Sequence, residues 1–477
     1  MAFAPSLSRR IQQELMVGFA AMILAVLGIL LFVQEKYIYY LIGFLSFAAI
    51  VWCQANTKRW IYLTIITIPI SPSLPIWKFK NPVTSELSDF VVMIVLMVFG
   101  FNYLMNQSKR KGFDKYITLP LLGYSVMAII SCAAGYYVHY EKILVINAAG
   151  HFLKWFSYLF LYIVIFKFFK NDKELKDLLR VTLLSITVGA AVAAASYFHN
   201  PVVQGRVHRS SGFMEGENAF AAILVIILLF YFNLVIQKKS RELFPNWIFY
   251  PCLMVILLAL VTTFSRTGWA ALAAGLIIIA FFKGRNYVAA LVIVMTIVAF
   301  LVLGKPAQQR IERTFEVQPW SHLPIDIGGR EGLWLLSISR FKDTGFWGVG
   351  YLNFGQTVMG TMPHNLFLAL IGESGPLGLF LFLFLYYRLF KSTFFIYRHH
   401  PDPFFKNCAF GMTIILFIIF IIEFLGEFLY GAPLVFTLFS LYGVCRISFQ
   451  NEVDKARETQ RLDKPLLRLN YQLNSFK

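Results

Sequence analysis

The sequence predicts an all-α integral membrane protein, a polytopic bundle of about 12–14 transmembrane helices. Of the 477 residues, 58% are hydrophobic and only 14% are charged, which gives more apolar surface than one soluble core could hide. Apolar runs of roughly 15 to 22 residues, long enough to cross a hydrocarbon core of about 30 Å, recur along nearly the whole chain. Because a lipid-exposed backbone must satisfy its own hydrogen bonds, these runs are expected to be helices.

The order of apolar and polar stretches divides the chain into four parts. We expect a first part of the bundle over 1–303, a long loop over 304–363, further membrane helices over 364–446 and a basic tail over 447–477. The predicted spans lie near 16–33, 37–53, 60–77, 87–105, 117–138, 151–169, 178–198, 218–236, 247–264, 268–282, 286–303, 364–390, 405–424 and 429–446. The span near 60–77 holds Pro69, Pro72 and Pro75, so we expect a kinked or re-entrant piece there.

The distribution of positive charge predicts the orientation. When the amino terminus is placed in the cytoplasm, about 29 of the 43 Lys and Arg residues fall on that side, which favours both termini in the cytoplasm. The net charge of +18 is then mainly a topology signal and gives little reason to expect nucleic acid as a partner. The basic tail after Arg446 could also contact anionic membrane lipids.

The first apolar run and the cysteines give two further expectations about this membrane protein. The first apolar run has no small-residue cleavage site after it, so we expect a retained anchor. The five cysteines lie in or at the ends of apolar runs, so we expect neither disulfides nor a cysteine metal site.

Three intervals on the side opposite the basic loops are longer than the rest, near 71–86, 199–217 and 304–363. Loops on a rigid scaffold commonly hold functional sites. The third interval contains two helix-like pieces, near 305–316 and 329–342. The second mixes apolar residues such as Trp334 with Arg330 and Arg340, which is typical of a helix lying at the membrane interface.

Two arginines in these regions are candidate phosphate ligands. Arg266 stands at a junction of two apolar spans, where it either snorkels, pairs with a carboxylate or binds phosphate through its fork of N–H donors. Arg330 starts the predicted interfacial helix, whose amino terminus would add free amides to an anion site; otherwise it is a solvated loop arginine. Arg206 and Arg209 form a small basic patch on the same side, either for binding or simply solvated.

His364 is the candidate general base. It follows Pro363 in the first turn of an expected helix, where the helix end favours the neutral imidazole that can accept a proton. The alternative is a polar residue that merely completes a helix cap. Asn365 could orient the ring or cap the helix. Glu373 would face away from His364 on an unbroken helix, but Gly372, Gly375 and Pro376 could bend the helix and change this geometry.

Other chemistries find little support in the sequence. It contains no His-Glu-x-x-His, no phosphate-cradling Gly-x-x-x-x-Gly-Lys and no Gly-x-Ser-x-Gly. Phosphate handling by arginines, with no metal and no cofactor, is the simpler expectation.

Across about 200–390 the motifs resemble the O-antigen ligase and polymerase superfamily of membrane glycosyltransferases. The resemblance rests on Gly212-Phe213-Met214-Glu215-Gly216-Glu217-Asn218, Ser265-Arg266-Thr267-Gly268, the long loop with Arg330 and Trp334, Gly345-Phe346-Trp347-Gly348-Val349-Gly350 and His364-Asn365 with Gly375 and Gly378. The spacing from His-Asn to Gly-x-x-Gly matches the ligase branch. An Arg followed four positions on by Leu, also typical of that branch, is missing because Ala270 takes the last place.

The resemblance implies a GT-C-like fold in a bacterial inner membrane, with a periplasmic site. It implies a glycan donor linked to undecaprenyl diphosphate and a hydroxyl acceptor, lipid A core or another. His364, Arg266 and Arg330 would be catalytic, and Arg206, Arg209, Asn218, Asn365 and Trp334 would bind substrate. The reaction would invert the anomeric centre without a metal.

We therefore expect an O-antigen ligase. A polysaccharide polymerase and a protein O-oligosaccharyltransferase of the same superfamily are alternatives. A transporter for a lipid or anion is a fourth, but transport predicts charges midway through several spans, whereas the arginines and the histidine gather on one side.

Overall fold

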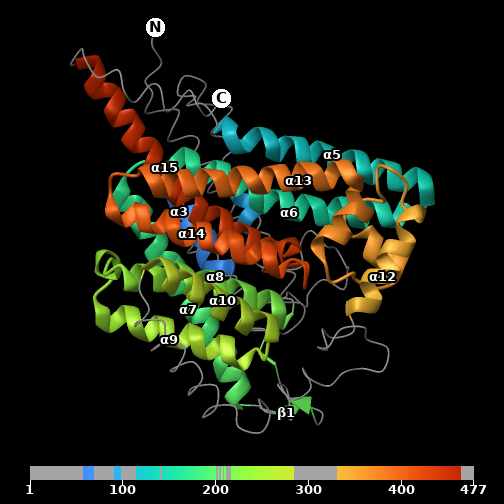
Figure 1. The fold of residues 1–477 in the computed structure, drawn as a ribbon, viewed down its shortest axis with the longest axis horizontal. Helices are drawn as coiled ribbons and strands as arrows, with labels where there is room; N and C mark the ends of the chain where they lie inside the picture. Colours follow the sequence, from blue (N-terminus) through green and yellow to red (C-terminus); the bar gives the residue numbers. More distant parts are fainter. Residues whose placement is uncertain are drawn as a thin grey trace, which may run out of the picture.

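The computed structural model describes residues 57–68, 91–97, 114–139, 142–199, 202–203, 206–207, 209–210, 216–283 and 330–462. Within these ranges the protein is a bundle of α-helices with one short two-stranded hairpin (Figure 1). The helices are α3 (Thr57–Thr67), α5 (Lys115–His139), α6 (Lys142–Phe168), α7 (Asp172–His199), α8 (Glu217–Ile236), α9 (Asn246–Thr262), α10 (Arg266–Lys283), α12 (Arg330–Arg340), α13 (Leu366–His399), α14 (Pro403–Ile422) and α15 (Ala432–Leu462).

Shorter elements connect them. They are the strands β1 (Val202–Val203) and β2 (Arg206–Val207), which pair antiparallel, and the short helices η3 (Ser240–Glu242), η4 (Phe341–Asp343), η5 (Phe354–Met359) and η6 (Phe428–Tyr430).

Seven of the described helices are long and apolar enough to cross a membrane, and α9 and α10 are shorter apolar helices. These observations confirm the predicted fold class. The predicted spans from 117–138 to 268–282 and the last three each coincide with one helix. Those near 16–33, 37–53 and 286–303, and the helix-like piece near 305–316, lie outside the described residues.

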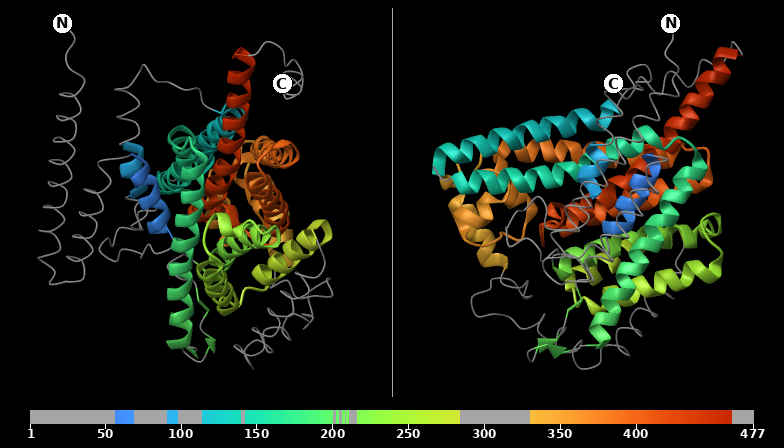
Figure 2. Two further views of the ribbon diagram at one scale, coloured as in Figure 1. Left: turned by 90° about the vertical axis from the view of Figure 1, so that its left-hand side faces the viewer. Right: turned by 180° about the vertical axis from the view of Figure 1, so that it is seen from behind.

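Helix α8 occupies the centre of the bundle. Every residue from Phe220 to Leu234 is buried, as expected for a helix that is apolar on all sides. It contacts α7, α9, α10, α14 and α15, while α5, α6 and α13 lie side by side in a separate layer (Figures 1 and 2).

The helix directions define two ends of the bundle. Asn233, near the end of α8, donates a hydrogen bond to the carbonyl of Asn407, near the start of α14, at 2.6 Å, so α8 and α14 run antiparallel. The start of α8 therefore lies at the end of α14, next to η6, which α8 contacts. We call this end, where α8 begins and α14 ends, the site end.

Helix α13 is broken within its first three turns. Gly375 has φ 68° and ψ 179°, outside the helical region, and Pro376 follows it. A Cβ on Gly375 would overlap the carbonyl oxygen of Phe346, so the loop before η5 packs directly against this break. The bend foreseen for this helix is present.

Two predicted boundaries differ from the structure. Helix α13 runs to His399, and α15 continues to Leu462, well into the predicted tail. Polar pairs within α15 explain part of this extension, because Gln450 donates to Asp454 at 3.0 Å and Lys455 pairs with Glu452 at 2.6 Å. Apolar patterning alone does not detect a helix that continues on such pairs.

Candidate active site at one end of the bundle

The segment that carries His364 is fixed by the start of α13. The Asn365 side chain accepts hydrogen bonds from the amides of Phe367 and Leu368 at 3.0 and 3.2 Å, which makes Asn365 the N-cap. His364 therefore precedes the helix. The prediction that it lies in the first helical turn is wrong. Its φ of 53° is unusual for a non-glycine residue. The sequence left open whether Asn365 orients the His364 ring or caps the helix, and in the structure it caps the helix.

A tight turn after α14 packs against this helix start. The Leu366 amide donates to the carbonyls of Glu423 and Gly426 at 2.9 and 3.0 Å. The Glu423 carboxylate in turn accepts hydrogen bonds from the amides of Phe428 and Leu429 at 3.0 and 2.9 Å. Backbone and side-chain bonds together hold the turn 423–429 beside His364.

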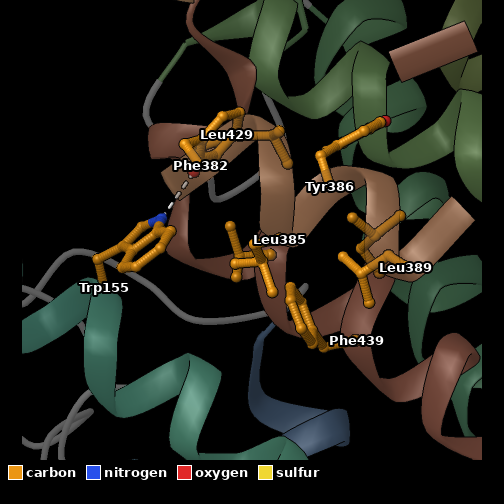
Figure 3. Close-up of a pocket in the computed structure, with 9 residues that line it drawn as sticks. Trp155, Phe382, Leu385, Tyr386, Leu389, Leu429 and Phe439 are labelled. Carbon is orange, nitrogen blue, oxygen red and sulfur yellow. Dashed lines mark hydrogen bonds between the residues drawn. The ribbon is translucent and has the colours of Figure 1, made fainter. Parts of the chain in front are cut away.

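A residue of α6 also contacts this turn. Trp155 donates through its indole Nε1 to the Leu429 carbonyl at 2.7 Å, across the edge of a small apolar cavity (Figure 3). Leu385 and Phe439 are among the residues that line this cavity. Its lining is aliphatic and aromatic, so it supports the turn and offers no polar group for chemistry.

Arg330, His364 and Glu427 lie within electrostatic range at this point, and we call them the His364 site. Arg330 begins α12, and its charge acts on both His364 and Glu427. The Glu427 carboxylate also faces the backbone amides of His364 and Asn365. A cation from one segment thus acts on a histidine and a carboxylate from two others at the site end.

The electrostatics of the site follow from partial burial. The His364 side chain is solvent-exposed, yet loss of part of its hydration and, second, the nearby Arg330 charge lower its pKa from the ordinary 6.5. Burial raises the pKa of Glu427 to about 7, against the opposing effects of the His364 and Asn365 amides and of Arg330. Near neutral pH, His364 is therefore mostly unprotonated, while Glu427 is poised between its two forms.

A second polar group, the Asn218 cluster, consists of Arg209, Glu217, Asn218 and Ser265. Arg209 donates to the Asn218 side-chain oxygen at 3.1 Å and pairs with Glu217 at 3.4 Å. Ser265 donates to the same Asn218 oxygen at 2.9 Å. Arg209 also donates to the carbonyl of Thr263 at 3.1 Å, so this arginine is already held by three partners.

Arg266 begins α10 directly beside that cluster. The Ser265 hydroxyl accepts from the Gly268 amide at 3.2 Å and caps the helix. A Cβ on Gly268 would lie 2.9 Å from the Ala221 Cβ, so the glycine lets α10 approach α8 closely. The motif Ser265-Arg266-Thr267-Gly268 thus combines a cap, a partly buried arginine and a close helix contact.

Both groups lie at the site end. The Asn218 cluster joins the starts of α8 and α10, and the His364 site joins the start of α13 to the turn after α14. Because α8 and α14 are antiparallel, these termini share one end of the bundle. The gathering of Arg266, Arg330 and His364 on one side, expected from the sequence, is therefore present.

Glu373 takes no part in the His364 site. It is 2% exposed, and its Oε2 accepts a hydrogen bond from the Tyr430 hydroxyl at 2.6 Å. Its backbone carbonyl accepts from the amide of Gly350 at 2.9 Å and from the Ser131 hydroxyl. These contacts tie the break in α13 to α5 and to the loop before η5.

Trp334 and Arg206 are the remaining predicted substrate-binding residues. Trp334 lies on α12, and its solvent-shielded indole Nε1 finds no hydrogen-bond partner within the described ranges. The backbone of Arg206 forms part of β2, and its side chain lies outside what the structure describes.

Sequence reasoning missed Glu423 and Glu427. A signal was present, because Glu423-Phe424-Leu425-Gly426-Glu427 places two carboxylates between two apolar runs, on the side predicted to hold His364. Ionisable groups so close to hydrocarbon usually have partners or functions.

The fold and the site together define a polytopic helical membrane protein with a polar site at one end of the bundle. Residues 251–383 match the family model described as O-antigen ligase. This match confirms the resemblance to the O-antigen ligase superfamily for a stretch that contains Arg266, Arg330 and His364. No curated protein matches the chain.

Proposed function

We propose that this protein is an O-antigen ligase that transfers a glycan from undecaprenyl diphosphate to a hydroxyl of lipid A core at the periplasmic face of the inner membrane. The observation that carries the proposal is that the Arg330 charge acts on His364 at the end of the bundle where Arg266 begins α10. The site end would face the periplasm, with both chain termini in the cytoplasm.

In the proposed reaction, an acceptor hydroxyl attacks the anomeric carbon of the donor while the bond to the diphosphate oxygen breaks. His364 would take the hydroxyl proton, and its lowered pKa keeps the accepting form populated near neutral pH. A single displacement of this kind inverts the anomeric centre.

The two arginines would act on the leaving group. Arg266 and Arg330 each begin a helix, so free backbone amides and the helix dipole would assist each guanidinium in binding phosphate oxygens. Negative charge on the diphosphate grows as the bond breaks, and contacts that strengthen with it lower the barrier. The arginines would perform this task without a metal.

The polar contacts around the site support the proposal physically. The Asn365 cap, the Leu366 amide and the Glu423 carboxylate fix the backbone on both sides of His364. A base held this way is pre-organised, which transfer chemistry requires more than lipid conduction does.

The lipopolysaccharide banding pattern of cells lacking the protein tests the proposal. We expect core without attached glycan, restored by the wild-type gene and not by His364→Ala at equal protein level. Core bearing a single repeat unit would indicate a polymerase instead. An unchanged ladder would contradict both and direct attention to protein glycosylation or transport.

A further inference from the structure

We propose that Glu427 is a positioning residue of the site: its ionised form offsets part of the Arg330 charge while the site is empty, and it takes up a proton from solvent when a diphosphate binds. This inference rests on the proposed function, because a diphosphate-bearing lipid is the ligand it requires. It adds a proton-coupled binding step and a carboxylate that lies outside the matched stretch 251–383.

The geometry of Glu427 is set by its neighbours. Gly426, directly before it, accepts the Leu366 amide at 3.0 Å, so Glu427 cannot move away from the His364 segment without breaking that bond. Its Oε1 atom is shielded from solvent and makes no hydrogen bond within the described part of the chain. A shielded, unpartnered carboxylate oxygen is costly unless a charge or a proton compensates it.

The protonation of Glu427 depends on the charged and titratable groups around it, which among the described residues are the following. Arg330 on α12 favours the carboxylate form. Glu373 on α13, Glu423 at the end of α14, and Tyr351 and Tyr430 each interact electrostatically with Glu427. His364 contributes a backbone amide and, when neutral, no charge. Within the described site, Arg330 is therefore a cation that favours ionised Glu427, after the His364 and Asn365 amides.

An incoming diphosphate changes this balance. It brings two negative charges to Arg330 and repels the ionised Glu427 carboxylate. Because burial already holds the Glu427 pKa at about 7, protonation near neutral pH costs little. The protonated carboxyl could then donate a hydrogen bond, which an ionised one cannot.

The test measures binding of a synthetic diphosphate diester, with a farnesyl chain on one phosphate and N-acetylglucosamine on the other, to the full-length protein in nanodiscs. A diester has no phosphate group that titrates near neutral pH, so any pH dependence belongs to the protein. We expect wild-type affinity to weaken as pH rises from about 6.5 to 8.5, approaching tenfold per pH unit above pH 7. His364 contributes little in this window, because its pKa lies below 6.5.

Glu427→Gln should bind tightly at all these pH values, with a flat profile. Glu427→Asp keeps a titratable group and should retain a slope. Asp343→Asn is the matched control, because Asp343 is a carboxylate after α12 that pairs with Arg340 at 3.3 Å, outside the site; it should follow the wild type. Calorimetry at pH 7.5 in two buffers of different ionisation enthalpy should give proton uptake for the wild type and none for Glu427→Gln.

The outcomes separate the inference from the proposed function. Wild-type binding whose pH slope persists in Glu427→Gln would overturn the role of Glu427 and leave the proposed function standing. A wild-type protein that does not bind the diester at any pH would contradict the proposed function itself. A thermal melt of each variant in the same nanodiscs shows whether it is folded.

Discussion

The two polar groups at the site end differ in how many of their hydrogen-bonding and charged atoms are paired with one another. In the Asn218 cluster, Arg209 has three partners and Asn218 accepts two hydrogen bonds, so the group is closed on itself. In the His364 site, the His364 ring is exposed to solvent and Glu427 keeps a shielded oxygen without a hydrogen bond in the described ranges. The first arrangement holds helices together, and the second is the one that we propose accepts a ligand.

This contrast predicts that substitutions at the two groups will have different consequences. Changes in the His364 site should reduce transfer with little effect on folding. Changes in the Asn218 cluster should reduce stability first.

The largest effect is expected for His364→Ala. Loss of a general base typically costs about 10²- to 10⁴-fold in rate, and donor affinity should stay within a few-fold because the arginines remain. Transfer rate and donor binding, measured on the same purified sample, check this. Loss of donor binding with an unchanged rate at saturating donor would show that His364 binds the donor and is not the base.

Arg330→Lys and Arg266→Lys should lower the transfer rate by about 10²-fold. A lysine keeps the positive charge but cannot form the bidentate contact with phosphate oxygens. Arg340→Lys, on the exposed side of α12, is the matched control and should be near wild type. Near-normal turnover of Arg266→Lys would remove Arg266 from the diphosphate contact.

The pH profile of kcat/KM should be bell-shaped. His364 acts as a base only when unprotonated and its pKa is lowered, so activity is lost as pH falls through a value below 6.5. Donor binding favours protonated Glu427, so activity declines as pH rises above about 7. In Glu427→Gln the alkaline decline should disappear while the acid limb remains. An acid limb that persists in His364→Ala would assign it to another group.

Asn218→Ala should have the smallest effect on catalysis and a clear effect on stability. It removes the oxygen that accepts hydrogen bonds from Arg209 and Ser265, at a cost of about 1–3 kcal/mol. Thermal unfolding in nanodiscs measures this, with the rate per folded molecule changing less than about threefold. A full loss of transfer in a folded variant would instead place Asn218 in contact with substrate.

Much of the fold was predictable because the apolar runs are long and separated by charged loops. The predicted ranges for α5 to α10 each coincide with one helix, and the helix-like piece near 329–342 corresponds to α12. The end of α15 was not predictable from hydropathy, since polar pairs such as Lys455 with Glu452 sustain it.

The site was predictable only in part. His364, Arg266 and Arg330 stand at span boundaries, where a charged or titratable residue is conspicuous in the sequence. Glu427 becomes relevant only through the packing of the turn 423–429 on Leu366, a contact between residues far apart in the chain. The pairing of Arg209 likewise depends on the approach of its segment to the start of α8 and the end of α9, which spacing along the chain does not encode.

The most direct test of the account is glycan transfer by the purified protein in nanodiscs, from a polyprenyl-diphosphate-linked glycan to lipid A core, with wild type, His364→Ala and Asp343→Asn compared. We predict transfer by the wild type and Asp343→Asn, and donor binding without transfer by His364→Ala. Transfer by His364→Ala at the wild-type rate would contradict the assignment of this end of the bundle as the catalytic site.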